Sequence, residues 1–404
     1  MPRSDDGLIL VAHRIPAETT PLGTWLADVA DRVVLVTSDA AAAGYAGQFG
    51  EVIGVDDYTA SNEVVEHLDR LCRTRRVSRI VHGTEDDILR LAQIRQRHGI
   101  PGMHVADALV FRDKYRMKVA AATRVRTPAF LAPETPADAI RFAAEVGWPV
   151  VVKPRSGFGS RGVAIVSDAG ALARELDGRS VDDVLVEAYV PGTVHHVDGF
   201  MSEGTVLFAA ASRYVNNCLS FADGTSLGSV QLDDGDPVAV GLLRFTEAVV
   251  AAMPPTGPTP FHLEVFRHEV TDELYFCEIA ARLGGGRIYE TLARTIGRDP
   301  VELWFRHQAG LPVDDGPITR GPQRYGFLLV PPRAGTLEEV KDVPLPAGVL
   351  QCDIPKDLPC TFRAAAASTD TVGSFIISGS SAADVEVTVR DCIGWSQEAL
   401  RWSA

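Results

Sequence analysis

The chain has 404 residues, of which 46% are apolar and 23% charged. These are ordinary values for a globular protein, and they exclude a disordered or low-complexity chain. The net charge of −14 disfavours nucleic acid and anionic membrane surfaces as partners, although a few cations and a metal ion could still hold a small anionic ligand. At about 150 residues per domain, the length predicts two or three domains.

Six cysteines are scattered along the chain: Cys72, Cys218, Cys277, Cys352, Cys360 and Cys392. None has CxxC spacing, so we expect reduced thiols rather than a disulfide framework. The apolar run at residues 8–12 is too short for a signal-peptide core. No stretch approaches the ~18 apolar residues of a membrane span. We therefore expect a soluble, cytoplasmic protein.

The first 110 residues alternate between strand-like and helix-like segments. Strands are expected at residues 7–12, 32–37, 51–55 and 79–82. Helices are expected at residues 22–30, 61–73 and 86–98. This alternation predicts an open parallel sheet with helices on its faces. The first turn lacks a GxGxxG sequence, so we expect no dinucleotide site there.

The rest of the chain is less regular. Helices are expected at residues 111–123, 134–146 and 381–392. Strand-forming residues dominate 184–215 and 260–280, and the turn-rich segment 312–322 predicts a boundary.

A glycine-rich segment follows the strand that ends at Lys153. Gly157, Gly159 and Gly162 match GxGxxG, but a strand at 163–166 follows them instead of a helix. The segment therefore predicts a hairpin with a glycine-rich tip, whose backbone N–H groups can cradle an anion. Lys153 is placed to contact phosphate oxygens. A flexible turn with an incidental lysine is the alternative.

Two carboxylates lie on neighbouring predicted strands. Glu264 and Glu278 flank the hydrophilic turn 268–273, so a hairpin would bring both to one face. Carboxylate oxygens together with nucleotide phosphates are usual ligands of Mg²⁺. Arg282, in phase with Glu278, could stabilise charge on a transferring phosphoryl group. The alternative is a surface hairpin with solvated acids.

A third segment is less specific. An apolar strand ends at Glu187 and leads into a strand with alternating polar residues, among them His196 and Asp198. The backbone just past Glu187 could hydrogen-bond an adenine edge. No zinc-ligand spacing or Ser-His-Asp set is present in the sequence.

In this order the segments resemble the ATP-grasp superfamily, in its carboxylate–amine (amino acid and dipeptide) ligase branch, over nearly the whole chain. The segment 112–118 resembles the family's first ATP-binding lysine motif, 147–162 its phosphate clamp and 186–192 its adenine hinge. The resemblance implies that ATP is bound by Lys114, Lys153, Ser156, Gly157, Gly159, Ser160, Gly162, Glu187, Ala188, Val190 and His196. It further implies that Glu264 and Glu278 hold Mg²⁺, with Mn²⁺ as an alternative, and that Lys153 and Arg282 act in catalysis.

The resemblance also implies an α/β fold, α+β in the C-terminal part, with four units. These are an N-terminal open parallel α/β domain (1–110), a lid with the glycine hairpin (111–186), a catalytic subdomain with the Mg²⁺ site (187–315) and a small β-rich domain (316–404). The implied activity is an ADP-forming ligase: ATP phosphorylates a substrate carboxylate, and an amine attacks the acyl phosphate to give an amide. The expected partners are small carboxylate and amine substrates, and relatives commonly form homodimers.

Two departures from the family pattern keep other interpretations open. Ala280 stands where the metal motif usually has asparagine, and Ala188 replaces a second hinge acid. Alternatives are a biotin-carboxylase-like or purine-pathway enzyme that uses bicarbonate or formate, and a non-catalytic nucleotide-binding protein. For the substrate carboxylate we favour Arg287 over Arg213, because Arg287 adjoins the site and arginine binds carboxylates in a bidentate manner.

Overall fold

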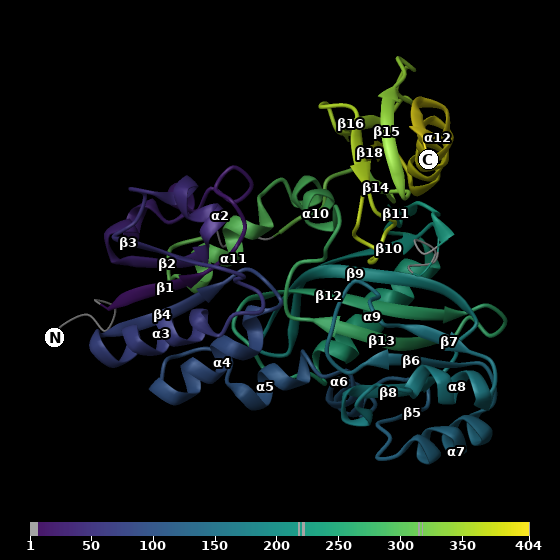
Figure 1. Cartoon of the computed structure of the whole chain (residues 1–404), viewed down its shortest axis with the longest axis horizontal. Helices are drawn as coiled ribbons and strands as arrows, with labels where there is room; N and C mark the ends of the chain where they lie inside the picture. Colours follow the sequence, from purple (N-terminus) through teal and green to yellow (C-terminus); the bar gives the residue numbers. More distant parts are fainter. Residues whose placement is uncertain (1–6, 217–218, 220–222, 314–315, 317, 404) are drawn as a thin grey trace.

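The computed structural model describes residues 7–216, 219, 223–313, 316 and 318–403. Figure 1 shows an N-terminal α/β unit on one side, a broad sheet in the centre, a smaller sheet with two helices below it and a C-terminal unit above. The broad sheet therefore joins all the other parts.

The first sheet is parallel and has the strand order β3-β2-β1-β4. Its strands are β1 (Leu8–Ala12), β2 (Val33–Ser38), β3 (Glu51–Val55) and β4 (Val77–His82). The helices of this unit are α1 (Leu22–Trp25), α2 (Asp39–Ala42), α3 (Glu63–Thr74), α4 (Asp87–His98) and α5 (Val105–Val110). The predicted parallel sheet is confirmed. The helix expected over 22–30 is wrong in its extent: α1 ends at Trp25 and a 3₁₀ helix (Ala27–Arg32) follows, since Gly23 and β-branched Thr24 disfavour a longer α-helix.

The smaller sheet has the order β5-β8-β6-β7, and all its pairs are antiparallel. Its elements are α6 (Lys114–Ala121), β5 (Phe130–Leu131), α7 (Pro136–Val146), β6 (Val150–Pro154), β7 (Ala164–Val166), α8 (Ala169–Leu176) and β8 (Val184–Ala188). The β6–β7 hairpin pairs Val150 with Val166, which confirms the hairpin predicted around the glycines. The helix α6 starts later than expected because the Asp113 side chain caps it, accepting from the Tyr115 and Arg116 N–H groups.

The broad sheet has eight strands in the order β13-β12-β9-β10-β11-β14-β18-β16. They are β9 (Gly192–Ser202), β10 (Thr205–Tyr214), β11 (Leu227–Gln231), β12 (Thr259–His268), β13 (Leu274–Ala280), β14 (Arg324–Val330), β16 (Val349–Asp353) and β18 (Gly373–Gly379). A three-stranded sheet contains β15 (Gly335–Val340), β17 (Cys360–Phe362) and β19 (Leu400–Ser403). The remaining helices are α9 (Pro237–Val250), α10 (Ile288–Ile296), α11 (Pro300–Gln308) and α12 (Ala382–Ala399). The pairing of β11 with β14 carries the broad sheet into the C-terminal part.

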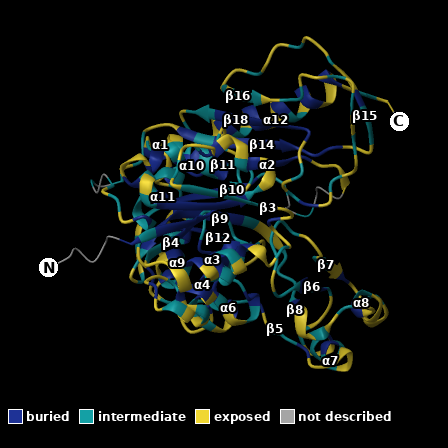
Figure 2. Cartoon of the chain, turned by 60° about the vertical axis from the view of Figure 1, so that its left-hand side comes forward, coloured by how far each residue is buried: buried dark blue, intermediate teal, exposed yellow. Residues whose placement is uncertain are grey.

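Burial follows these layers. Figure 2 shows β9 and β12 largely buried in the centre, whereas α7 and α8 carry many exposed residues. Phe111 and Met117 pack in the core of β9, β12 and α9, so α6 is anchored to the broad sheet. Helix α11 packs on the N-terminal sheet through Phe305. These contacts join α6 to the broad sheet and α11 to the N-terminal unit.

Five cysteines, Cys72, Cys277, Cys352, Cys360 and Cys392, are free thiols. Cys218 lies outside the described residues. Among the described residues, every helix is too short or too polar to cross a membrane.

Candidate active site

The tip of the β6–β7 hairpin has a backbone that needs glycine. Gly159 and Gly162 have φ of 68° each and Gly157 has φ of 148°, a region that side chains rarely occupy. Ser160 also has a positive φ of 59°. The Lys114 ammonium donates a 2.9 Å hydrogen bond to the Gly157 carbonyl and so ties the tip to α6.

Three buried lysines and one buried carboxylate lie beneath this tip. Glu187 forms ion pairs with two of the lysines: its Oε1 lies 2.8 Å from Nζ of Lys153 and 3.3 Å from Nζ of Lys118. Burial alone would lower the pKa of Lys153, but the Glu187 carboxylate raises it above its usual value. For Lys118, burial outweighs Glu187 and the pKa is lowered. Lys114 instead pairs with Glu278 at 3.2 Å. Lys118 belongs to the predicted lysine motif, but its pairing with Glu187 is beyond what the sequence indicated.

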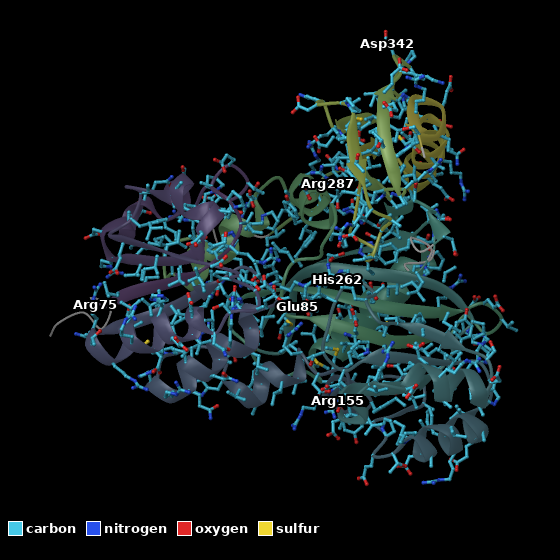
Figure 3. The ribbon with its side chains drawn as sticks, viewed as in Figure 1. Arg75, Glu85, Arg155, His262, Arg287 and Asp342 are labelled. Atoms are coloured by element: carbon cyan, nitrogen blue, oxygen red, sulfur yellow. The ribbon has the colours of Figure 1, made fainter. Side chains whose placement is uncertain are left out.

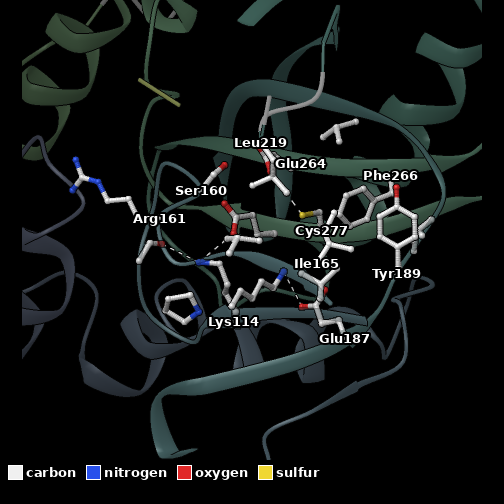
Figure 4. A pocket seen from close by; sticks show the side chains of 18 of the residues that line it. Lys114, Ser160, Arg161, Ile165, Glu187, Tyr189, Leu219, Glu264, Phe266 and Cys277 are labelled. Atoms are coloured by element: carbon white, nitrogen blue, oxygen red, sulfur yellow. Dashed lines mark hydrogen bonds and ion pairs between the residues drawn. The ribbon is translucent and has the colours of Figure 1, made fainter. Parts of the chain in front are cut away.

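A cavity of about 130 Å³ opens beside these lysines. Its walls include Lys114 and Lys153 at one end and apolar side chains further along, among them Val151, Ile165, Tyr189, Val190, Val194 and Phe266. Figure 4 shows Lys114 and Glu187 on one side of this pocket and Glu264 and Phe266 on the other. A narrow apolar slot that ends at buried cations suits a flat base with a polyphosphate chain.

The predicted hinge lies at the apolar end of the slot. Ala188 and Val190 line it, as do Gly157 and Ser160 from the hairpin tip. The Ala188 N–H already donates a 2.8 Å hydrogen bond to the Ala129 carbonyl.

The remaining residues predicted to contact ATP lie at different distances from the slot. Gly159 lines the neighbouring cavity, and Ser156 and Gly162 line neither cavity. A Cβ atom at Gly162 would come within 3.0 Å of Pro154, so Gly162 serves the shape of the tip.

Glu264 and Glu278 face each other across β12 and β13, as the sequence predicted. Both line the slot and also a second, wider cavity of about 300 Å³. Burial alone would raise the pKa of Glu278, but the Lys114 and Lys153 ammonium groups lower it to about 2. Two carboxylates at the junction of two cavities form a donor set that fits Mg²⁺. Ala280 offers no side-chain oxygen.

Arg282 reaches from the end of β13 to the N-terminal unit. Its Nε and Nη2 atoms each lie 2.7 Å from Glu85, in the loop after β4, and Arg112 forms a second ion pair with Glu85. Burial would lower the pKa of Arg282, but Glu85 raises it. Arg282 and Glu85 both line the second cavity. No local pattern in the sequence marks Glu85 as part of the site.

His196 was predicted to contact the nucleotide, and the structure corrects this. It lines neither cavity. Its Nδ1 lies 2.5 Å from Asp198 and its Nε2 lies 2.7 Å from Ser229, so both ring nitrogens are engaged inside the protein. Strand periodicity puts Asp198 on the same face as His196, where its carboxylate forms a hydrogen bond with the imidazole.

Asp198 also joins His262, at 2.8 Å from its Nδ1. Burial alone would lower the pKa of His262, but the Asp198 carboxylate raises it to about 10. His262 lines the second cavity, and its Nε2 lies 3.6 Å from Glu264. His262 belongs to none of the sequence motifs, although the alternation His262–Leu263–Glu264 places its ring beside a predicted metal ligand.

Arg287 was predicted to hold a substrate carboxylate, and this too is corrected. Its guanidinium donates to Ser374 at 2.9 Å and to Glu290 at 2.7 Å, and it forms an ion pair with Asp353. It lines a separate surface cavity, and Figure 3 shows it nearer the C-terminal unit than Glu85 and His262 are. Arg287 directly precedes α10, and this placement turns its side chain toward β16 and β18. Arg213 pairs with Glu386 at 2.6 Å.

The second cavity is covered by two segments that lie far apart in the sequence. Phe158, Gly159 and Ser160 come from the hairpin tip, and Ser368 and Thr369 come from the loop before β18. The Ser368 N–H donates a 3.2 Å hydrogen bond to the Gly159 carbonyl. The tip and the C-terminal part thus meet above the carboxylate pair.

The chain is similar in sequence and fold to several known proteins. Residues 112–196 match the family model described as the ATP-binding domain of the carbamoyl-phosphate synthase L chain. An L-arginine-specific L-amino acid ligase of Bacillus subtilis is 26% identical over 338 residues, which cover 80% of each chain. The crystal structure of an L-amino acid ligase from Bacillus licheniformis superposes with a TM-score of 0.75 at 16% identity, over 98% of this chain and 99% of the other. The biotin carboxylase domain of the Hydrogenobacter thermophilus 2-oxoglutarate carboxylase, solved with MgADP, ADP and bicarbonate, has a TM-score of 0.65 at 17% identity, over 98% of this chain and 91% of that one.

Proposed function

The chain belongs to the ATP-grasp superfamily, and we propose that it is an ADP-forming ligase that joins a carboxylate to an amine. Its substrates are amino acids or related small metabolites. One observation carries the proposal: Glu264 and Glu278 lie where two cavities meet, with Lys114 and Lys153 on one side and Arg282 on the other. A phosphoryl group could pass between two bound molecules at this junction.

The two cavities suit the two halves of the reaction. ATP would occupy the slot, with its phosphates near Lys114, Lys153 and the hairpin tip. An oxygen of the acid substrate attacks the γ-phosphorus, the bond to ADP breaks and an acyl phosphate forms. The amine nitrogen then attacks the acyl carbon, phosphate leaves and the nitrogen loses a proton to give the amide.

The residues around the junction have distinct parts in this scheme. Lys114 and Lys153 offset charge on the phosphates, and Arg282 offsets charge on the group being transferred. Glu264 and Glu278 would hold Mg²⁺, which when bound neutralises phosphate charge. The contact between Gly159 and Ser368 covers the junction and excludes water, which would otherwise hydrolyse the acyl phosphate.

The free thiols of the described cysteines support a cytoplasmic location, which is also part of the proposal.

Phosphate release from ATP and Mg²⁺ tests the proposal across a panel of amino acids, offered singly and in pairs. We expect release to require two substrates, with a product whose mass is the sum of the two minus water. Release that needs only bicarbonate would assign the protein to the carboxylases instead. Bound ATP with no turnover under any condition would contradict the ligase proposal.

A further inference from the structure

The second cavity has an apolar wall. Phe327 and Leu329 from β14, Tyr214 from β10, Leu227 from β11 and Ile288 from α10 line it. All five are less than a tenth exposed and belong to one apolar cluster. We call them the apolar wall.

The wall adjoins the carboxylate pair. The Tyr214 hydroxyl lies 3.4 Å from Oε1 of Glu264, and Tyr214 packs in the cluster with the other wall residues. A molecule whose carboxylate binds beside Arg282, at the junction of the two cavities, would therefore extend its side chain along the wall. The amine substrate has no such constraint, since its nitrogen needs to reach only the acyl carbon.

The other charged groups that line the cavity already have partners. Glu85 is paired with Arg282 and Arg112, and Asp86 lies 3.6 Å from Arg14. Because each of these acids is already paired with at least one arginine, a cationic side chain would gain less there than beside an unpaired carboxylate. A polar side chain placed against the hydrocarbon side chains of the wall, Leu227, Ile288, Phe327 and Leu329, would lose water without gaining a hydrogen bond, which is unfavourable.

We propose that the acid substrate of this enzyme carries an uncharged, apolar side chain that packs against the apolar wall. This inference rests on the proposed ligase function, because it assigns the side chain of the molecule that is phosphorylated. An apolar side chain gains by leaving water at such a wall, whereas a charged one must give up hydration there. The preference should be at least about tenfold in kcat/KM.

Trapping with hydroxylamine tests the inference without knowledge of the natural amine. Hydroxylamine attacks an acyl phosphate and releases phosphate, so hydroxamate formation with ATP and Mg²⁺ reports which acid is activated. We expect kcat/KM for leucine, methionine and phenylalanine to exceed that for arginine, lysine and aspartate by at least about tenfold. Arginine or aspartate used as well as leucine would overturn this inference and leave the ligase function standing. No hydroxamate from any acid would overturn both.

Substitutions in the wall give an independent test. Leu329→Ala enlarges the cavity, so the ratio of kcat/KM for phenylalanine to that for leucine should rise several-fold while the KM for ATP stays unchanged. Phe327→Leu keeps an apolar wall and changes its volume less, and it should raise the same ratio. This variant replaces Leu329→Ala as the test if Leu329→Ala does not fold. Leu207→Ala, at a half-exposed position on β10 outside the cavity, is the matched control. An unchanged ratio in a folded wall variant would contradict the inference.

Discussion

Glu187 is the residue on which the cationic end of the nucleotide slot depends. Its carboxylate is 2% exposed and contacts both Lys118 and Lys153. The two ammonium groups repel each other, and the Glu187 carboxylate lowers the free-energy cost of burying both. Glu187, which also lines the slot, therefore positions the two lysines there.

Replacing Glu187 by glutamine should test this role. Removing one partner of a buried ion pair costs about 3–5 kcal/mol, so we expect a clearly lower melting temperature and a KM for ATP raised at least about tenfold. The control is Glu273→Gln, because Glu273 pairs with Arg126 at 3.0 Å on the surface, where such pairs contribute about 0–1 kcal/mol. Equal melting temperatures for the two variants would contradict the role given to Glu187.

Lys153 and Glu278 should be required for turnover. Lys153→Ala and Glu278→Ala each remove a charge at the junction of the two cavities, and we expect ADP formation to fall by at least about 10²–10³-fold. Lys341→Ala changes an exposed lysine in the C-terminal part and should leave the rate near that of the wild type. Full ADP formation by either junction variant, measured with a coupled assay, would overturn the site assignment.

The sequence was informative about these residues to different degrees. Glu264 and Glu278 could be paired from the hairpin pattern, because strand register determines which side chains share a face. Arg287 and His196 could not be placed from local pattern alone, since one partner of each, Ser374 and Ser229 respectively, comes from a distant strand. Glu85 is likewise brought to Arg282 only by the packing of the N-terminal unit on the broad sheet.

At the scale of elements, α11 depends on two buried histidines. The His13 ring packs edge-on against Phe305 with centroids 5.1 Å apart, and His82 packs against Trp304 at 5.2 Å. Burial is the main cause that lowers the pKa of each histidine to about 3. Both rings are therefore neutral where α11 meets the N-terminal sheet.

This arrangement predicts acid sensitivity. The unfolded chain binds protons near pH 6.5 and the folded chain only near pH 3, so stability is intact above pH 6.5 and falls between pH 6.5 and 3. The expected loss is about 1.4 kcal/mol per pH unit for each histidine. His13→Leu should make the fall in melting temperature shallower over this range. The half-buried His67 on α3 supplies the control, His67→Leu, and an equal slope in both variants would contradict the explanation.

Elements could be predicted where local signals were strong. The alternation of strand-like and helix-like segments predicted the parallel sheet, and the glycine spacing predicted the β6–β7 hairpin. The order of the eight strands in the broad sheet could not be predicted, because β14 and β18 join it only after a long excursion of the chain. Local pattern carries no information about such long-range pairing.

At the scale of the whole molecule, the C-terminal part completes the broad sheet. β11 pairs with β14, which pairs with β18, and Arg324 is held by Asp233 at 3.1 Å across this region. A chain truncated after residue 322 would expose the long edge of β11 and part of its apolar core. We expect it to aggregate or to lack a cooperative melting transition. A soluble truncated protein that still releases phosphate would show that residues 323–404 are dispensable.

The hydrogen bond between Gly159 and Ser368 has a consequence for how many ATP molecules the proposed reaction uses for each product. One backbone contact contributes only about 0.5–1.5 kcal/mol, so the cover that it closes can open once in every catalytic cycle. If the cover opened before the amine arrived, water would consume the activated acid and the ATP would yield no product. For the proposed ligase, the number of ATP molecules hydrolysed per amide bond would therefore depend on this contact between the hairpin tip and the loop before β18.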